Sequence, residues 1–322
     1  MKSMDVAYLE KGLMSYRSSF PRPTLAADQV LIEVSLAGIC ATDLALLRGY
    51  ASFEGVPGHE FVGRVVETGD QVESSWMNQR VVAEINQFCG HCQHCTAKRF
   101  NHCEHRQVIG IRDHQGAFAQ YIAVKASTLH RLPETLEDQK AVFIEPLAAA
   151  YRIVEQLADV PYHNVLIIGA GKLGQLIARV MSHEACSVSV VTRRSKQDAL
   201  LKGLPIQCLV EADVQPQAWD VVIEASGQQA GLNLALKAVR PCGRIILKST
   251  YIDTSEWPLS SLVIHEVSLI GSRCGPFPKA ISALQAGLNP LPLIDGEYPL
   301  NEIQDAIAHA ARSGAMKILL RP

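Results

Sequence analysis

Four cysteines gathered in a short stretch constrain this chain more than any other feature of its sequence. Cys89, Cys92, Cys95 and Cys103 lie within fifteen residues, at steps of three, three and eight. Four thiolates with this spacing can surround one Zn²⁺ tetrahedrally, and a zinc site with no open position is a structural one. Two disulfides are the alternative, which the intracellular character of the flanking sequence disfavours. The spacing therefore predicts a lobe, about residues 86–106, that is too small and polar to hold together without metal.

A second group of candidate metal ligands lies upstream of the cysteine lobe. Cys40 is followed by Thr42 and Asp43, and His59 is followed directly by Glu60. A thiolate, an imidazole and a carboxylate are the ligand types of a catalytic zinc that keeps one position open. Alone, the cysteine would be a small buried apolar residue, and the histidine an ordinary loop residue. Together, and beside a structural-zinc lobe, they predict a second zinc site.

Composition places the chain among globular proteins with two domains. Its 322 residues are long for one core, and 48% apolar with 19% charged residues is ordinary for a globular protein. The net charge of −2 offers no electrostatic footprint for nucleic acid or an anionic membrane. No apolar run reaches the length of a spanning helix, no signal-peptide core is present, and the odd count of nine cysteines argues for a reducing compartment. We therefore expect a soluble, cytoplasmic protein.

Secondary-structure signals change character near Ala141. Before it, short strands such as 29–36 and 61–67 are broken by Gly and Pro, which favours a barrel-like β domain. A helical run over 141–157 leads into a segment where apolar strands alternate with helices, which predicts a parallel sheet covered on both faces. The strands are expected at 164–169, 186–192, 220–224, 243–248 and 267–271, and the helices at 172–183 and 233–239. The remainder, about 273–322, carries two amphipathic helical runs and a terminal apolar strand.

A glycine-rich turn opens the first helix of that predicted sheet. The turn reads Gly169-Ala-Gly171-Lys172-Leu173-Gly174. Its glycines allow a tight turn, close approach of a pyrophosphate, and close packing of helix on sheet. The helix N-terminus adds free N–H groups for the phosphates. An ordinary strand-to-helix turn is the alternative, but the context predicts that these residues bind a dinucleotide.

The end of the next strand bears on the choice of dinucleotide. An NAD site would carry Asp or Glu about twenty residues past the glycines, whereas this chain has Thr192, Arg193 and Arg194, and no carboxylate before Asp198. The planar guanidinium fork suits a phosphate dianion. We therefore predict that the site prefers NADP(H) to NAD(H). A solvated basic loop, or a site that uses both cofactors, is the alternative.

The motifs together resemble the zinc-containing medium-chain dehydrogenase/reductase family of alcohol, polyol and sugar dehydrogenases. The resemblance runs nearly from end to end. Its carriers are Cys40-Ala-Thr42-Asp43, Gly58-His59-Glu60, the four-cysteine lobe, Glu145-Pro-Leu-Ala148, the run from Gly169 to Gly174, and the closing Lys317-Ile-Leu-Leu-Arg-Pro322. Because all six occur in this order and spacing, the probability of chance agreement is very small.

The resemblance implies an α/β protein in which a doubly wound Rossmann sheet accompanies a GroES-like β-barrel catalytic domain with a structural zinc lobe. The catalytic domain would occupy residues 1–147, and the dinucleotide-binding domain residues 148–272. Residues 273–322 would return to the catalytic domain, which makes that domain discontinuous.

The resemblance also implies the ligands of the catalytic zinc. Cys40 and His59 would be its firm ligands, and Glu60 a ligand or an exchangeable one. Glu145 would bind the metal directly or through water. For Glu145 the alternative is a carboxylate that merely begins a helix before Pro146.

Further roles follow by the same resemblance. The Thr42 hydroxyl would hydrogen-bond the reacting oxygen and pass its proton toward solvent, and Asp43 would accept from the second ring nitrogen of His59. A loop cap is the alternative for this Thr-Asp pair. Many relatives have a histidine where this chain has Ala45, so the exit route of the proton stays open. Arg273 would reach the cofactor phosphates or be a solvated loop residue.

The leading hypothesis is a zinc-dependent dehydrogenase that acts with NADP on a small-molecule alcohol or polyol, or on the corresponding aldehyde or ketone. It would hold two zinc ions per chain, one catalytic and one structural, and would form a homodimer or homotetramer. A zinc-independent enone reductase on the same fold is disfavoured because Cys40, His59 and the cysteine lobe are all present. A non-catalytic, nucleotide-binding relative is disfavoured by the intact set of Cys40, Thr42, His59 and Glu60. The sequence does not select a substrate, a direction or a stereochemistry.

Overall fold

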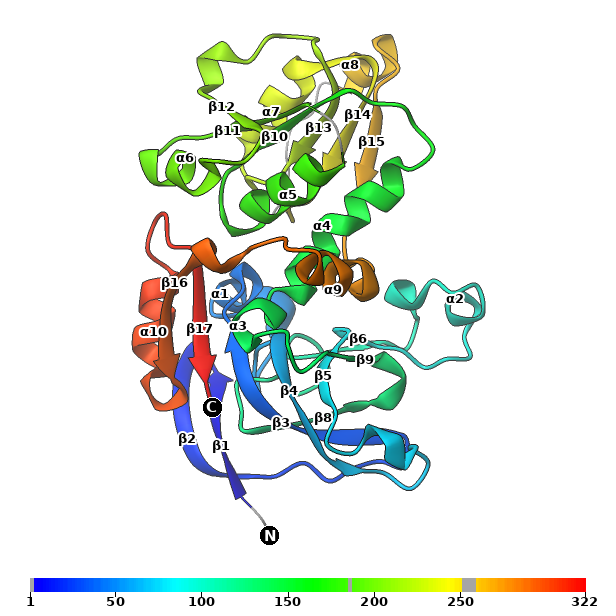
Figure 1. The fold of residues 1–322 in the computed structure, drawn as a ribbon, viewed down its shortest axis with the longest axis vertical. Helices are drawn as coiled ribbons and strands as arrows, with labels where there is room; N and C mark the ends of the chain where they lie inside the picture. Colours follow the sequence, from blue (N-terminus) through cyan, green and yellow to red (C-terminus); the bar gives the residue numbers. More distant parts are fainter. Residues whose placement is uncertain (1–2, 185–186, 251–258) are drawn as a thin grey trace. The chain divides into compact units, whose positions relative to one another are not determined.

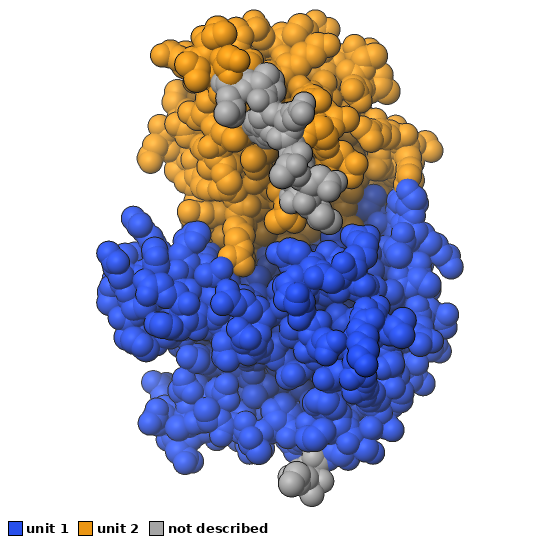
Figure 2. Space-filling model, turned by 180° about the vertical axis from the view of Figure 1, so that it is seen from behind, with its two compact units in different colours: residues 1–145, 277–322 blue, residues 146–276 orange. Residues whose placement is uncertain are grey.

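The computed structural model describes residues 3–184, 187–250 and 259–322. These form two compact units, one made of residues 1–145 and 277–322 and the other of residues 146–276 (Figure 2). The sequence placed the corresponding boundaries at 147/148 and 272/273. Across the described ranges, no helix combines the length and apolar character that crossing a membrane requires.

The first unit is built on a seven-stranded sheet in the order β16-β17-β3-β4-β5-β9, with β8 also paired to β3. Its strands are β3 (Gln29–Gly38), β4 (Glu60–Thr68), β5 (Arg80–Ala83), β8 (Tyr121–Lys125), β9 (Leu129–Arg131), β16 (Ile294–Pro299) and β17 (Lys317–Arg321). The strands expected at 29–36 and 61–67 are confirmed as β3 and β4. The last strand, β17, runs antiparallel to β3 with Leu319 opposite Gly38 (Figure 1). The end of the chain thereby lies beside residues from its first forty.

Two small two-stranded sheets, β1 with β2 and β6 with β7, and several short helices complete this unit. The hairpin of β1 (Ser3–Glu10) and β2 (Leu13–Pro21) turns at Lys11 and Gly12, whose φ angles are +49° and +77°. Positive φ at both central residues is the geometry of a tight two-residue hairpin turn, and this hairpin was not expected from the sequence. The remaining elements are β6 (Asn86–Gln87), β7 (Gln107–Val108), α1 (Ala41–Leu46), α2 (Gln93–Thr96), α3 (Asp138–Ala141), α9 (Phe277–Gln285) and α10 (Ile303–Ala310).

The second unit is a six-stranded, wholly parallel sheet in the order β12-β11-β10-β13-β14-β15. Its strands are β10 (Asn164–Ile168), β11 (Ser187–Val191), β12 (Ile206–Leu209), β13 (Trp219–Glu224), β14 (Val239–Leu247) and β15 (Ser268–Gly271). Its helices are α5 (Lys172–His183), α6 (Ser195–Leu201), α7 (Gln229–Ala238) and α8 (Leu259–Ile264), and α4 (Ile144–Leu157) leads into it. Leu166, Val222 and Ile245 from three neighbouring strands pack with Leu234 and Ala235 of α7 in its core. The expected α/β architecture with a parallel sheet is confirmed.

Some details of this unit were not expected from the sequence, or lie outside the described residues. Strand β12 was not expected, because Ile206–Leu209 is short, is interrupted by Gln207 and has two of its four side chains exposed. Val239, expected at the end of a helix, begins β14 instead, because its β-branched side chain fits a pleated strand. Cys186, expected at the start of a strand, lies outside the described residues, and that strand is described from Ser187.

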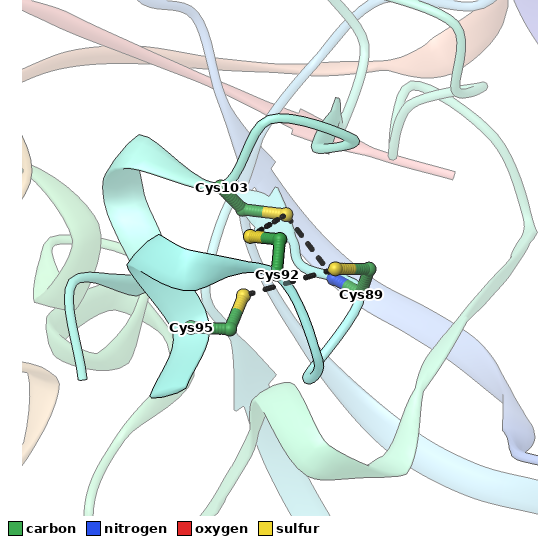
Figure 3. Close-up of side chains that lie close together, drawn as sticks. All are labelled: Cys89, Cys92, Cys95 and Cys103. Atoms are coloured by element: carbon green, nitrogen blue, oxygen red, sulfur yellow. Dashed lines mark hydrogen bonds between the residues drawn. The ribbon is translucent and has the colours of Figure 1, made fainter. Parts of the chain in front are cut away.

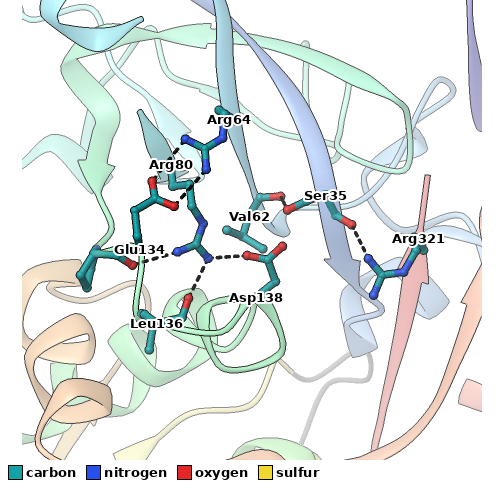
Figure 4. A network of polar contacts seen from close by, with 9 residues as sticks. Ser35, Val62, Arg64, Arg80, Glu134, Leu136, Asp138 and Arg321 are labelled. Atoms are coloured by element: carbon teal, nitrogen blue, oxygen red, sulfur yellow. Dashed lines mark hydrogen bonds and ion pairs between the residues drawn. The ribbon is translucent and has the colours of Figure 1, made fainter. Parts of the chain in front are cut away.

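A polar network fastens the segment before α3 to the sheet of the first unit (Figure 4). Arg80 of β5 donates to the carbonyl oxygens of Pro133 and Leu136 at 2.8 and 2.7 Å and forms an ion pair with Asp138. Arg64 of β4 holds Glu134 at 3.0 Å. The chain that runs on through α3 to Glu145 is therefore anchored before it reaches the candidate metal ligands.

Candidate functional site

The four lobe cysteines converge on one point (Figure 3). The Sγ atoms of Cys89 and Cys95 are 3.9 Å apart, and so are those of Cys92 and Cys103. A tetrahedron of sulfurs with Zn–S bonds of about 2.3 Å has edges of about 3.8 Å, whereas a disulfide brings its sulfurs to about 2.05 Å. The geometry fits one Zn²⁺ held by four thiolates and does not fit two disulfides.

The apolar cluster of the lobe is small. It consists of the four cysteines with Phe88 and Phe100, whose rings stack at 4.3 Å. Backbone N–H groups of Glu104 and Cys95 lower the pKa of Cys92 to about 6, whereas burial raises the pKa of Cys95. Because a zinc ion needs all four sulfurs deprotonated, its binding releases protons and becomes part of the folding free energy of the lobe.

A second group of ligand atoms lies where β3 ends and β4 begins in the same unit. One atom from each of Cys40, His59 and Glu60 falls within 4.8 Å of the other two. Cys40 follows β3 and is the N-cap of α1, while Glu60 is the first residue of β4 and lies opposite Gly38 of β3. Pairing of the end of β3 with the start of β4 therefore brings together ligands that are twenty residues apart in the chain.

The turn before His59 requires a glycine. Gly58 has φ of +93°, and a Cβ on it would lie 2.3 Å from the Phe118 ring. The left-handed backbone and the buried ring together force the chain to turn so that the imidazole is 3% exposed.

Asp43 connects the segment that carries Cys40 to the segment that carries His59. This fully buried carboxylate accepts from the backbone N–H of Cys40 at 2.7 Å and of Gly58 at 3.3 Å. Its Oδ1 lies 3.6 Å from Nδ1 of His59, which has no hydrogen-bond partner in the described part of the chain. Burial raises the pKa of Asp43, opposed by the charge of His59. Burial lowers the pKa of His59, but Asp43, Cys40 and Glu145 outweigh it and raise that pKa well above its usual value.

The other expected residues of this site lie nearby. The Thr42 hydroxyl is 3.7 Å from the Cys40 sulfur. Glu145, in the first turn of α4, is outside the three-ligand group, yet its charge acts on both His59 and Lys317. Ala45 lies within α1 and offers no side-chain hydrogen-bonding group.

The sequence-based reasoning missed one charged residue of the site. Lys317, the first residue of β17, is 2% exposed, and its Nζ forms an ion pair with Glu60. Nζ also lies 5.7 Å from the centre of the Phe143 ring. Burial lowers the pKa of this amine, but the charges of Glu60 and Cys40 outweigh it and raise the pKa. The available signal was a lone lysine at the start of an otherwise apolar strand.

The glycine-rich turn of the second unit has the form that a pyrophosphate requires. Gly169 has φ of +105°, and a Cβ on it would lie 2.7 Å from the backbone nitrogen of Ser226. A Cβ on Gly174 would lie 1.8 Å from the carbonyl oxygen of Gly169. Gly171, the N-cap of α5, has open space where its Cβ would be. Two glycines thus allow close packing and the third leaves the helix N-terminus open to an anion, so the turn fits a dinucleotide.

Thr192 and Arg193, which are expected to bind the cofactor, lie at the same edge of the sheet as the glycine-rich turn. Ile168 pairs with Val191, so Gly169 and Thr192 both follow the carboxyl ends of adjacent parallel strands. Thr192 is buried, whereas Arg193 is exposed and reaches within 3.8 Å of Glu211.

The remaining two expected arginines lie apart from each other. Arg194 is the N-cap of α6. Arg273 follows β15, with β13 and β14 between that strand and β10. The carbonyl oxygen of Arg273 accepts from Lys248 at 2.6 Å, and the Arg273 side chain is exposed.

Comparison with known proteins finds relatives that are named as dehydrogenases. A family model described as the alcohol dehydrogenase GroES-like domain matches residues 26–134. A sorbitol dehydrogenase of Halalkalibacterium halodurans is 28% identical, over 94% of this chain and 94% of its own length. An L-threonine 3-dehydrogenase of Legionella pneumophila is 29% identical, over 99% of both chains.

Solved structures share the whole fold. One, described as a zinc-binding dehydrogenase of Sinorhizobium meliloti bound to NADP, is 27% identical with a TM-score of 0.91 over 100% of both chains. Another, described as an alcohol dehydrogenase of Escherichia coli CFT073 complexed with NADH, is 28% identical with a TM-score of 0.89 over 100% of both chains.

Proposed function

We propose that this chain, which belongs to the zinc-containing medium-chain dehydrogenase/reductase family, transfers hydride between a nicotinamide dinucleotide and a small alcohol or polyol or its carbonyl counterpart. The observation that carries the proposal is the convergence of Cys40, His59 and Glu60 in the first unit. We further propose two zinc ions per chain, the second held by the four lobe cysteines.

The residues of the first unit have separate roles in this proposal. Cys40 and His59 would hold Zn²⁺, which would supply a Lewis acid for the substrate oxygen, and a bound nicotinamide would supply or accept the hydride. The Thr42 hydroxyl, beside the thiolate ligand, accepts the proton of the substrate hydroxyl and passes it on. Asp43 orients the His59 ring. Because Ala45 carries no polar side chain, the proton leaves Thr42 by another group or by water.

We also propose that NADP(H) is preferred, and that Arg193 contributes to this preference. The support is its exposed guanidinium at the carboxyl end of β11, beside the strand that leads into Gly169. The relatives include structures with NADP and with NADH, so the preference has to come from residues of this chain.

Replacing Arg193 by Asp is expected to lower the ratio of kcat/KM with NADP to kcat/KM with NAD by about 10- to 100-fold. The lost charge-assisted hydrogen bonds are worth about 1.5–3 kcal/mol, and the new carboxylate repels a phosphate. Lys202→Asp, the same charge change at the exposed C-cap of α6, is the control and should leave the ratio unchanged. An unchanged ratio in Arg193→Asp would show that Arg193 does not select the cofactor.

We propose that the chain forms a homo-oligomer through the outer edge of the parallel sheet. Strand β15 pairs on one side with β14 and is the last strand of the sheet. Its Leu269 is 40% exposed, and Val263 and Ile264 of the adjoining α8 are 76% and 73% exposed. Such an edge strand with apolar neighbours is a template for pairing with another chain.

The double variant Val263→Lys, Ile264→Lys is expected to shift the protein to a monomer in size-exclusion chromatography with light scattering, because two buried cations would oppose the interface. Leu13→Lys, at a 74% exposed position in the first unit, should leave the mass unchanged. An unchanged mass in the double variant would rule out this edge as the interface.

A further inference from the structure

Lys317 is a buried cation within the candidate catalytic zinc site. Lysine is almost never fully buried unless it is paired, and this one is 2% exposed with Glu60 as its partner at 1%. Both residues are placed by strand pairing. The N–H of Ile39 donates to the carbonyl oxygen of Ile318 at 2.9 Å, which sets Lys317 beside Cys40, and Glu60 lies opposite Gly38.

On one side, Glu60 and Lys317 pack against the backbone of Gly38, which has no side chain. A Cβ on Gly38 would lie 2.8 Å from Oε2 of Glu60 and 3.2 Å from Cδ of Lys317. The centre of the Phe143 ring lies 5.7 Å from Nζ of Lys317. The lysine therefore has little freedom to leave the carboxylate, and only 2% of its surface is exposed to water.

Glu60 faces two competing partners for its negative charge. One of its oxygens is engaged by Nζ of Lys317, while the residue also belongs to the group of ligand atoms with Cys40 and His59. Charges attract strongly where water is excluded, so a carboxylate held by an ammonium is a weaker metal ligand than a free one. Removing the amine would leave a buried, uncompensated carboxylate, for which a metal cation is the nearest counter-charge.

We propose that Lys317 is a positioning residue that competes with the metal for Glu60, which makes Glu60 an exchangeable ligand and keeps one coordination position open to the substrate. The inference rests on the proposed zinc site of the first unit. Strand β17 thereby has a function, because its Lys317 determines how much of the time Glu60 occupies a coordination position of the metal.

The test measures the rate at which a chelator removes zinc from the purified protein, followed with a colorimetric zinc indicator. The phase that belongs to the proposed catalytic ion is the one missing from Cys40→Ser. In Lys317→Met this phase is expected to slow by roughly 10- to 100-fold, the range for changes to groups that surround metal ligands, because Glu60 then stays on the metal. Lys317→Arg keeps the charge and should release zinc at a rate close to that of the unmodified protein.

A double variant separates positioning from a general effect on folding. In Lys317→Met combined with Glu60→Gln, the slowing should disappear, because the amide offers the metal no charge. Glu60→Gln alone leaves Lys317 as an unpaired buried cation beside the metal, which by itself speeds release, so this single variant does not decide. If Lys317→Met does not fold, Lys317→Gln, which also removes the charge, decides: an unchanged or faster release would overturn the inference.

The outcomes distinguish this inference from the proposed function. Absence of the Cys40-dependent phase from the unmodified protein would refute the zinc site itself. A phase that is present, but unchanged or faster in Lys317→Met, would overturn only the role of Lys317.

Discussion

Replacing Cys40 by Ser is expected to lower turnover by about 10³-fold or more while nucleotide binding stays close to normal. The serine hydroxyl is not ionised at neutral pH and is a poor zinc ligand in place of a thiolate. The loss of the metal would remove several kcal/mol of charge stabilisation from the reaction. The glycine-rich turn belongs to the other compact unit, so the dinucleotide should still bind. Turnover with alcohols or aldehydes and titration of NADPH fluorescence measure the two effects.

The matched control is Cys242→Ser, the same chemical change at an exposed cysteine of the second unit. Its turnover should equal that of the unmodified protein. Substantial turnover in Cys40→Ser would show that this thiolate does not hold a catalytic metal, and loss of nucleotide binding would show damage beyond the zinc site.

Replacing Cys95 by Ala is expected to act on stability. The variant removes one of four converging sulfurs from a lobe whose apolar cluster is the four cysteines and two phenylalanines. Structural zinc contributes folding free energy directly, so a loss of several kcal/mol is expected. A change of about 1 kcal/mol moves Tm by about 2–4 °C in a protein of this size class, which predicts a fall in Tm of about 10 °C or more, or aggregation. Scanning calorimetry and zinc analysis measure both.

Cys208→Ala is the control for this variant, because Cys208 is an exposed cysteine on β12. It should leave the Tm and the zinc content unchanged. If Cys95→Ala kept its Tm and its zinc but lost activity as fully as Cys40→Ser, the division into a structural and a catalytic ion would be wrong.

Local patterns predicted much of the second unit. The helix expected at 172–183 is α5 with the same bounds, and the strand expected at 164–169 is β10, which ends one residue earlier. Both are marked in the sequence by apolar periodicity and by the glycines between them, so no distant partner is needed to recognise them. Strand β12 lacks such a marker, because it is four residues long and Gln207 interrupts its apolar residues.

The first unit shows why a site cannot be read completely from a sequence. The residue types and spacing of Cys40, His59 and Glu60 were enough to predict a metal site. Lys317 joins them from 257 residues further along the chain than Glu60, through pairing of β17 with β3. Nothing in the local pattern of a terminal strand tells which residues it will lie beside. The contact of Asp43 with the N–H of Gly58 likewise depends on a turn whose direction only the fold determines.

The most direct test of the account is the number of zinc ions per chain, measured by elemental analysis on purified protein from which loosely held metal has been washed. The account predicts two, of which Cys40→Ser removes one and Cys95→Ala the other. One ion in the unmodified protein, released only on unfolding, would contradict the account. It would leave the cysteine lobe as the sole metal site and favour a zinc-independent reductase or a non-catalytic, nucleotide-binding protein.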